Sequence, residues 1–355
     1  MHARCGGANR QPSAVPLIFF HNSIEGLRGE CYRRGHRSVR SAETIMGGAL
    51  LSMSFIRKIR TLLGADRAER PPETPTGRWS IGIYTGSGPF SFRPPAGVAN
   101  PVITADDVTD AAANFVADPF MVREAGRWHM FFEVEAAGGS ANIGKIGLAT
   151  SPDGASWQYE RIVLEEPFHL SYPYVFPWKG DYYMVPETRA VREVRLYRAV
   201  DFPYAWEFAG ILMQRRRFAD SSLFHWRGRW WMFTDSGNTT LRLYFAEALS
   251  GPWREHPRSP IVRRDPRIAR PGGRAVVLED GIIRYAQDDQ KSYGSQVWGF
   301  RVTALSRRVY REEASPVPVI SAGGGGWRRF GMHTIDPHHL EDGRWIACVD
   351  GFGEV

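Results

Sequence analysis

Acidic residues recur along this sequence at a fixed distance behind a glycine. In each of five segments an Asp or Glu follows a glycine by seven positions, and these acids are Glu133, Glu187, Asp235, Asp288 and Asp350. Carboxylates gathered around one cavity can hydrolyse glycosidic bonds, with one ionised as base or nucleophile and another protonated as acid. An acid at the same offset in every segment can also cap a backbone turn, and we expect that structural role for Glu133, Asp235 and Asp350.

A second group of residues precedes each of these glycines. An apolar run follows each of the dipeptides Asp118-Pro119, Tyr172-Pro173, Asp220-Ser221, Arg270-Pro271 and Asp336-Pro337. Between glycine and acid the residues are largely aromatic or aliphatic, as in GRWHMFFE and GRWWMFTD, which indicates a turn feeding a strand. Each repeat therefore predicts two antiparallel strands, the first starting at the dipeptide and the second ending at the acid.

The length of the repeat predicts the architecture. The glycines are 48 to 62 residues apart, close to the period of about 50 in kelch-type propeller blades. We expect an all-β fold, a five-bladed β-propeller over residues 79–355 with a disordered basic N-terminal tail at 1–76. The blades are predicted at about 115–165, 170–213, 218–262, 269–313 and 333–355. Because little chain follows Asp350, we expect residues 79–84 to close the last blade; a truncated C-terminus is the alternative.

Composition and charge narrow the classes of function. Hydrophobic residues make up 43% of the chain and include 12 Trp, yet no apolar run reaches the 18 or so residues that a transmembrane helix needs. Residues 1–78 carry 13 Lys and Arg against 6 Asp and Glu, which accounts for the whole net charge of +7. The repeat domain is therefore formally neutral, which argues against a nucleic-acid partner because a basic stripe is needed to replace phosphate counterions.

The basic tail has one periodic segment, MSFIRKIRTLLG at 53–64. It predicts either a short amphipathic helix in weak contact with an anionic membrane surface or a solvated leader, with translation starting at Met46 or Met53. We expect the leader. The three cysteines show no CxxC spacing and no paired framework, which is compatible with a reducing compartment, and a cytoplasmic location is the default expectation.

The two predicted strands of each blade place their polar ends at one face of the propeller. The dipeptides and the repeat acids would then surround one mouth of the central channel as a polar, acid-rich cup. Tyr172, Tyr174, Trp178 and Tyr182 are candidate sugar-stacking side chains. Glu187 differs from the other repeat acids because Pro186 ends strand pairing just before it.

The segment HTIDPHH at 333–339 contains possible metal ligands. Alternation along a strand sends His338 and His339 to opposite faces, so we expect no metal site there and no cofactor. His333 and Asp336 remain candidates for binding substrate.

Several motifs resemble known families. ADPF at 117–120 and the DP-type blade starts resemble the five-bladed propellers of glycoside hydrolase families 43 and 32. From Trp79 to the C-terminus the chain resembles the N-terminal domain of glucosamine inositolphosphorylceramide transferase and its bacterial relatives. The motifs that carry this second resemblance are SYPYVF at 171–176, VPET at 185–188, ARPGGR at 269–274, AQD at 286–288 and YGSQV at 293–297.

The resemblance to family 43 implies roles for two acids and a departure at a third position. Asp118 would be the general base, and Asp220 would orient and tune the acid. The fourth blade of that family starts with the Glu that acts as general acid, whereas this chain has Arg270, which stays protonated near neutral pH. Either Glu187 supplies the acid instead, or the site only binds its ligand.

The remaining candidates suit binding. Arg270 and Arg274, with Gln287 and Asp288, would grip a carboxylate or phosphate on a sugar, and Tyr172 lies among them in the predicted cup.

Three functions remain open at this point. The first is a carbohydrate-active enzyme of glycosidase type that acts on or binds a sugar with an anionic group. The second is a non-catalytic glycan-recognition domain that serves a glycosyltransferase, with a carbohydrate or glycoconjugate as partner. The third is a protein-interaction propeller, although WD and kelch propellers usually close with more blades. The sequence does not name the sugar or the linkage.

Overall fold

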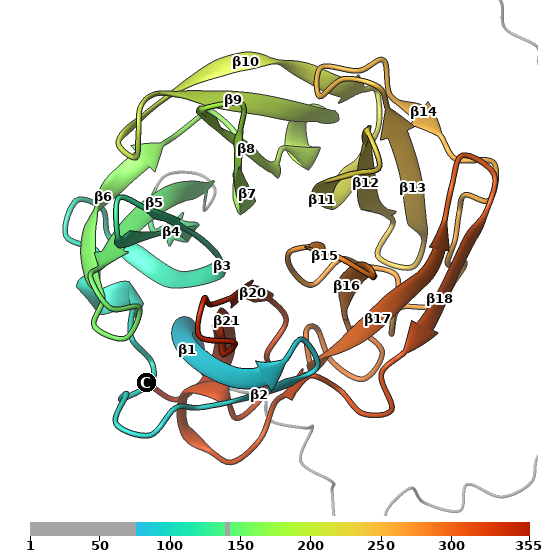
Figure 1. The fold of residues 1–355 in the computed structure, drawn as a ribbon. Helices are drawn as coiled ribbons and strands as arrows, with labels where there is room; N and C mark the ends of the chain where they lie inside the picture. Colours follow the sequence, from blue (N-terminus) through green and yellow to red (C-terminus); the bar gives the residue numbers. More distant parts are fainter. Residues whose placement is uncertain (1–75, 139–142) are drawn as a thin grey trace, which may run out of the picture. The chain divides into compact units, whose positions relative to one another are not determined.

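The computed structural model describes residues 76–138 and 143–355. The predictions for the basic tail, including the helix at 53–64, lie outside the described residues. Five antiparallel sheets surround a central axis, and the first strand of each sheet lies nearest to that axis (Figure 1). The prediction of an all-β, five-bladed β-propeller is confirmed.

The first three blades each contain four strands in chain order from the axis outward. Their strands are β3 (Ala113–Glu124), β4 (Arg127–Ala136), β5 (Ile143–Ser151) and β6 (Gln158–Leu164); β7 (Ser171–Trp178), β8 (Asp181–Glu187), β9 (Glu193–Asp201) and β10 (Ala205–Gln214); and β11 (Phe218–Trp226), β12 (Arg229–Ser236), β13 (Leu241–Ala246) and β14 (Arg254–Glu255).

The fourth and fifth blades depart from that simple order. In the fourth, β19 pairs with β17 beside the main sheet, and in the fifth, β1 pairs with β21 from Arg78 to Gly86. The N-terminal strand thus fills the third position of the last blade. The strands are β15 (Val276–Leu278), β16 (Gly281–Gln287), β17 (Gln296–Leu305), β18 (Tyr310–Ala314) and β19 (Ile320–Ser321), then β20 (Ile335–His339), β21 (Trp345–Gly353), β1 (Arg78–Gly88) and β2 (Ser91–Arg93).

Helices contribute little to the described part of the chain. It contains three single turns of 3-10 helix, η1 (Ala105–Asp107), η2 (Arg189–Val191) and η3 (Gly326–Arg328). Within these residues no helix has the length and apolar character needed to cross a membrane.

Tight hairpins join the first two strands of the first three blades. In each, a residue with positive φ precedes the repeat glycine, as at Ala125 and Gly126 with φ of 49° and 81°. Two consecutive positive φ values are characteristic of the type I′ turn, whose twist matches that of the flanking strands. The repeat glycine therefore marks the hairpin, although Gly281 of the fourth blade already lies within β16.

The inner strands do not start where the sequence predicts. β3, β7 and β11 begin before their dipeptides, and the pairing register shifts at each dipeptide. The register shift is a β-bulge, which interrupts a strand without ending it. In the fourth blade the inner strand starts later than predicted, because β15 begins only at Val276. Residues 270–275 contact neighbouring strands through isolated bridges.

Gly273 explains why the fourth blade starts irregularly. Its φ is 140°, and a Cβ atom at this position would lie 1.7 Å from the carbonyl oxygen of Ile335. Tyr172 Oη accepts a hydrogen bond from Gly273 N at 2.8 Å, and Ser222 Oγ donates one to Gly273 O at 2.9 Å. A residue without a side chain thus lets four blades meet near the axis.

The hydrophobic core lies between neighbouring blades. One cluster joins the first three blades around Phe120, Tyr174 and Met232, and others join the fifth blade to its two neighbours. A fourth cluster around Phe233 and Ile282 joins the third and fourth blades. The apolar faces of adjacent sheets therefore stabilise the ring and hold the inner strands in place.

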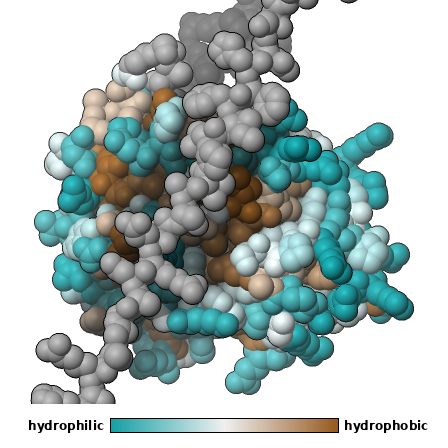
Figure 2. All heavy atoms as spheres, turned by 90° about the horizontal axis from the view of Figure 1, so that it is seen from above, coloured by the Kyte–Doolittle hydropathy of each residue, from teal (hydrophilic) through white to brown (hydrophobic). Residues whose placement is uncertain are grey.

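The outer edge of the second blade exposes both apolar and polar side chains. Figure 2 looks onto the propeller from the side of β10 and shows apolar side chains next to polar ones. The exposed large hydrophobic residues of this edge are Val200, Tyr204, Phe208 and Ile211.

Candidate functional site

The bulges in the inner strands determine where three predicted site residues point. Asp118, Tyr172 and Asp220 have φ values of 52°, 47° and 49°. Residues other than glycine rarely adopt this left-handed conformation, which persists only where the surrounding structure imposes it. At each bulge the regular alternation of side chains is interrupted, so that consecutive residues can present polar groups toward the axis.

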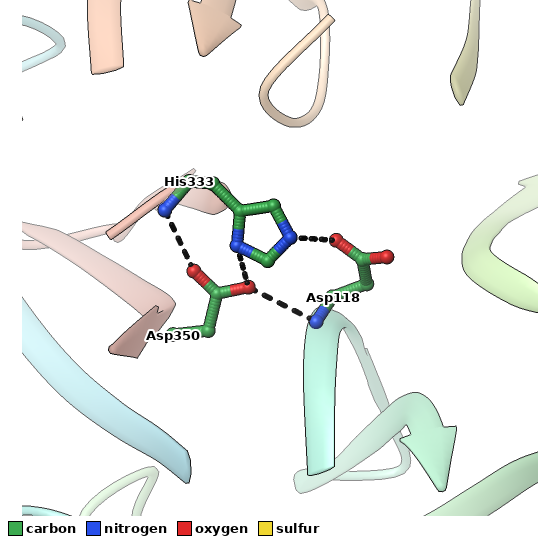
Figure 3. Close-up of side chains that lie close together, drawn as sticks. All are labelled: Asp118, His333 and Asp350. Atoms are coloured by element: carbon green, nitrogen blue, oxygen red, sulfur yellow. Dashed lines mark hydrogen bonds and ion pairs between the residues drawn. The ribbon is translucent and has the colours of Figure 1, made fainter. Parts of the chain in front are cut away.

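His333 lies between two carboxylates (Figure 3). Its Nδ1 is 2.8 Å from Asp350 Oδ2, and its Nε2 is 3.3 Å from Asp118 Oδ1. Asp350 also accepts backbone hydrogen bonds from Asp118, His333 and Thr334 at 3.1, 2.9 and 2.9 Å. Thr334 Oγ1 donates to Asp118 Oδ1 at 2.6 Å. This cluster links the fifth blade to the first, on the cup side of the axis.

The two acids favour the charged form of the histidine. Burial alone lowers the pKa of His333, but Asp350 and Asp118 outweigh burial and raise that pKa to about 9. Burial raises the pKa of Asp118 to about 6 despite the opposing charge of His333. Near pH 7 the cluster therefore holds an imidazolium between carboxylates.

The same cluster is where a metal ion could fit best among the described residues. One ligand atom from each of Asp118, His333 and Asp350 lies within 4.8 Å of the others. A metal would need neutral His333, whereas both carboxylates favour its protonated form. A divalent cation bound here would therefore have to displace the proton of His333.

A second cluster surrounds Asp220, which is 1% exposed. Arg270 Nε donates to Asp220 Oδ2 at 2.6 Å, and Gln287 Nε2 donates to the same oxygen at 2.9 Å. Arg270 Nη2 also lies 3.9 Å from Glu187 Oε2. Arg270, which stands where family 43 has its general acid, is thus paired with Asp220, the residue expected to orient and tune that acid.

Besides Gln287 Oε1, this cluster has a second buried oxygen without a hydrogen-bond partner among the described residues, which belongs to Glu187. Its side chain is 10% exposed, and Oε2 is buried with no hydrogen-bond partner among the described residues. Burial and the charge of Asp220 raise the pKa of Glu187 to about 8, against the effect of Arg270. The carboxyl is therefore protonated near neutral pH.

Glu133 joins the acids at the centre. It lies 3.3 Å from His169 Nε2, and burial and the charge of Asp118 raise its pKa well above the usual range. Glu187 and Asp220 also raise this pKa, which places all four acids in one electrostatic environment. No backbone N–H of the described residues donates to its carboxylate, but residues 139–142 of the loop after β4 lie outside the described structure, so turn capping by Glu133 stays a prediction.

The other repeat acids have structural roles. Asp235 accepts hydrogen bonds from the backbone of Asn238 and Thr240 at 2.6 and 3.1 Å, so it caps the loop after β12 as predicted. Asp350 accepts the backbone hydrogen bonds that close the ring. The expected ligand-binding residue Asp288 instead accepts hydrogen bonds from Gln296 Nε2 and Trp298 Nε1 at 2.9 and 3.3 Å.

Arg274 and Asp336 lie apart from the cup acids. Arg274 pairs with Asp336 through Nε, and His338 Nε2 lies 2.9 Å from Asp336 Oδ2. Asp336 also accepts a hydrogen bond from the backbone of Met121 at 2.6 Å. Arg274 and His338 line a pocket of about 660 Å³ that Trp178 and Trp230 also border. These predicted binding residues therefore form a separate buried ion pair.

The aromatic side chains predicted to stack on sugar do not face the cup. Tyr172 and Tyr174 are buried, while Trp178 packs on His225 and Tyr182 stacks on Phe202 with ring centroids 4.7 and 3.8 Å apart. Burial between blades provides their large apolar area with a partner inside the protein.

Two other aromatic residues border the cup instead. Trp79 and Tyr293 lie against His333, with ring centroids 4.1 and 5.3 Å away, and Tyr293 is 48% exposed. The guanidinium of Arg270 lies 5.3 Å from the Tyr293 ring. Sequence reasoning missed both as site residues, although Tyr293 belongs to the YGSQV motif and Trp79 begins the segment expected to close the ring.

The structure therefore gathers part of the predicted site. The gathered residues form a cluster of largely buried side chains near the axis, for which the name cup is kept, with Trp79 and Tyr293 beside it; its members are Asp118, Glu133, Glu187, Asp220, Arg270, Gln287 and His333. Tyr172 supports it through hydrogen bonds to Ser222 and Gly273.

Solved structures share this fold at low sequence identity. A putative glycoside hydrolase from Parabacteroides distasonis matches with a TM-score of 0.56 and 13% identity, over 72% of this chain and 95% of its own. The β-1,2-mannobiose phosphorylase from Listeria innocua matches with a TM-score of 0.56 and 13% identity, over 76% of this chain and 96% of its own. This similarity shows a glycosidase-like propeller fold.

Curated proteins match this chain at higher sequence identity than these solved structures do. Glucosamine inositolphosphorylceramide transferase 1 from Oryza sativa subsp. japonica is 35% identical over 300 residues, which is 78% of this chain and 40% of the relative. The protein of the same name from Arabidopsis thaliana is 33% identical, over 78% of this chain and 39% of the relative. The chain thus spans about 40% of the length of these relatives. Residues 72–352 match the family described as glucosamine inositolphosphorylceramide transferase 1, N-terminal, and the chain belongs to that family.

Proposed function

We propose that this propeller is a glycan-recognition domain that serves a glycosyltransferase and binds the carbohydrate of a glycolipid in the central cup. The curated relatives are named as transferases, and this chain matches less than half of their length. A domain that holds an acceptor or product sugar while another part of the same protein or a partner performs the transfer fits both facts.

The observation that carries the proposal is the ion pair between Arg270 and Asp220. Hydrolysis of the family 43 type needs a protonated carboxylic acid at the start of the fourth blade, and an arginine there cannot donate its proton near neutral pH. The distance of 2.6 Å between Arg270 Nε and Asp220 Oδ2 also commits the carboxylate to a fixed ion pair. One predicted catalytic residue, Asp220, is therefore paired with the arginine that replaces the general acid of family 43, which favours binding over hydrolysis.

The side chains around the cup suit a polyhydroxylated ligand. Trp79 and Tyr293 offer aromatic faces on which a sugar ring can pack, while Asp118 and Glu187 can accept or donate hydrogen bonds. Arg270 Nη1 makes no hydrogen bond to the described residues, so its two N–H groups remain for a hydroxyl or an anionic group. The expectation that both Arg270 and Arg274 grip an anion needs revision, because Arg274 is committed to Asp336.

Glycosidase-type hydrolysis is a second candidate, and Glu187 is the observation that favours it. A carboxyl with its pKa raised to about 8 is protonated at pH 7, whereas Asp118, with a pKa of about 6, is largely ionised. Two acids whose environments separate their pKa values can divide the roles of acid and base. In this mechanism Glu187 protonates the leaving oxygen and Asp118 activates water.

The first experiment separates binding from turnover. The protein is incubated with a panel of aryl glycosides and acidic oligosaccharides, and its binding is measured on a glycan array. We expect binding without hydrolysis. Hydrolysis that disappears in Glu187→Gln and Asp118→Asn would establish the second candidate in place of the first.

A matched pair of aromatic variants tests the location of the site. Tyr293→Ala removes a side chain that borders the cup and is 48% exposed, whereas Tyr204→Ala removes one of similar exposure, 45%, on the outer part of the second blade. We expect the first variant to weaken glycan binding about tenfold and the second to leave it unchanged. Equal binding by both variants would show that the ligand does not contact Tyr293.

A further inference from the structure

Loops with exposed arginines surround part of the cup face. Because β8 and β12 run toward the cup and β11 starts there, the loops at 188–192, 215–217 and 237–240 lie on this face. The segment at 263–267 joins them, since Asp265 N donates to Thr239 O at 3.1 Å. Seven arginines on these loops are exposed; Arg267 pairs with Asp265, and the other six, here called the arginine rim, are Arg192, Arg215, Arg216, Arg217, Arg263 and Arg264.

The arginine rim carries charge that the described residues do not compensate. None of its members forms an ion pair within the part of the chain that the structure describes. Nearby acids are already committed, because Glu166 and Glu193 pair with Arg195, and Asp265 pairs with Arg267. The rim is therefore a local positive field on a propeller that is formally neutral as a whole.

The backbone holds these arginines in fixed loops. Arg216 N donates to Arg192 O at 3.1 Å, which joins two of the loops. Arg192, Arg215 and Arg264 have φ values of 60°, 64° and 52°, a conformation that costs free energy for any residue other than glycine. The side chains thus project from loops whose shape the surrounding structure imposes.

We propose that the arginine rim docks on an anionic lipid surface, so that the cup faces the membrane. A lipid surface fits better than a nucleic acid because the charge is confined to a few loops beside the cup, without the long basic stripe that a polynucleotide requires. Anionic headgroups attract each arginine near a bilayer surface independently. If the cup binds a glycolipid carbohydrate, an assumption that rests on the proposed function, this docking brings the sugar of a membrane-embedded lipid to the cup.

Vesicle binding by the full chain tests the proposal. Sedimentation is measured with vesicles of phosphatidylcholine alone and of phosphatidylcholine mixed with phosphatidylglycerol. The rim variant combines Arg215→Ala, Arg216→Ala and Arg217→Ala. The control variant combines Arg161→Ala, Arg308→Ala and Arg311→Ala, which removes the same charge from exposed positions outside the cup-face loops. Because both variants retain the N-terminal tail, any binding by the tail is common to them.

We expect the wild type and the control variant to bind only the anionic vesicles, more weakly as salt is added. The rim variant should lose on the order of a hundredfold in partition coefficient. Equal losses in both variants, or equal binding to both kinds of vesicle, would overturn the proposal. Glycan-array binding distinguishes this outcome from a failure of the proposed function, because the rim variant should keep the soluble glycan binding of the wild type.

Discussion

Replacement of Glu187 by Gln should make the protein more stable at high pH and leave its stability unchanged at low pH. Gln has the shape of a protonated Glu but cannot ionise. The carboxyl of Glu187 is 10% exposed and lies near Asp220, and its pKa is raised from 4.5 to about 8. Ionisation in the folded state is therefore unfavourable, whereas it is free in the unfolded chain.

The sign of the pH dependence follows from these two pKa values. Below about pH 4.5 the carboxyl is protonated in both states, so the wild type and Glu187→Gln should unfold with similar free energies. Between about pH 4.5 and 8 only the unfolded wild type loses the proton, so its free energy of unfolding falls relative to that of the variant. At 1.36 kcal/mol per pKa unit, the difference above pH 8 should be at most about 5 kcal/mol.

Urea unfolding at pH 4.5, 7 and 9 measures this difference directly. Glu165→Gln is the control, because Glu165 has an exposed side chain, paired with Lys145 at 2.6 Å. A difference between wild type and Glu187→Gln that stays constant over this pH range would refute the reasoning, since it would mean that Glu187 ionises alike in the folded and unfolded states. A rising difference in the Glu165→Gln control would attribute the effect to net charge.

Three further predictions concern the groups that hold the cup together. Arg270→Met should lower the free energy of unfolding by about 3 to 5 kcal/mol because it leaves Asp220 charged and buried, and Arg270→Met with Asp220→Asn should regain most of it in urea unfolding. Gly273→Ala should cost at least about 3 kcal/mol because its Cβ would overlap neighbouring backbone, whereas Gly343→Ala, with open space around it, should cost about 1 to 2 kcal/mol. The raised pKa of His333 stabilises the fold below about pH 6.5, and this contribution is lost as pH rises through about 9. The melting temperature of the wild type should therefore fall between pH 7 and 9.5 by more than that of His333→Gln. An equal fall in the two proteins would contradict this prediction.

The five repeat acids lie at the same distance behind a glycine but have different roles in the structure. Asp235 caps a loop, Asp288 binds side chains of β17, and Asp350 links the last blade to the first. Glu133 and Glu187 remain near the axis with strongly raised pKa values. The offset places each acid at the end of a second strand, but the loop that follows decides which donors reach the carboxylate.

The contrast between Asp220 and Asp118 bears on function. Both lie on bulges at equivalent points of their blades. Asp220 faces an arginine and an amide, while Asp118 faces a histidine and a threonine. If the cup performs chemistry, Asp118 and Glu187 are the pair to test; if it only binds, Trp79 and Tyr293 should dominate the affinity.

The sequence by itself determined the number of blades and most of their strands. This information is local, because a glycine after a positive-φ residue closes a hairpin and an alternating apolar run forms the strand beside it. It also singled out Asp118, Glu187, Asp220, Arg270, Gln287 and His333, all of which lie in the cup. It misjudged the inner-strand starts, because a bulge leaves no distinct pattern in the residues themselves.

Only the tertiary structure decided which of these residues meet. Thr334 and Asp118 are 216 positions apart, and Asp350 binds the backbone of Asp118 across 232 positions. Arg274 was predicted beside Arg270 but pairs with Asp336, and the predicted stacking residue Tyr174 is buried between blades. Ring closure brings the two ends of the propeller together, and the resulting burial raises the pKa values of the acids at the axis. Neither effect can be read from the spacing of residues along one blade.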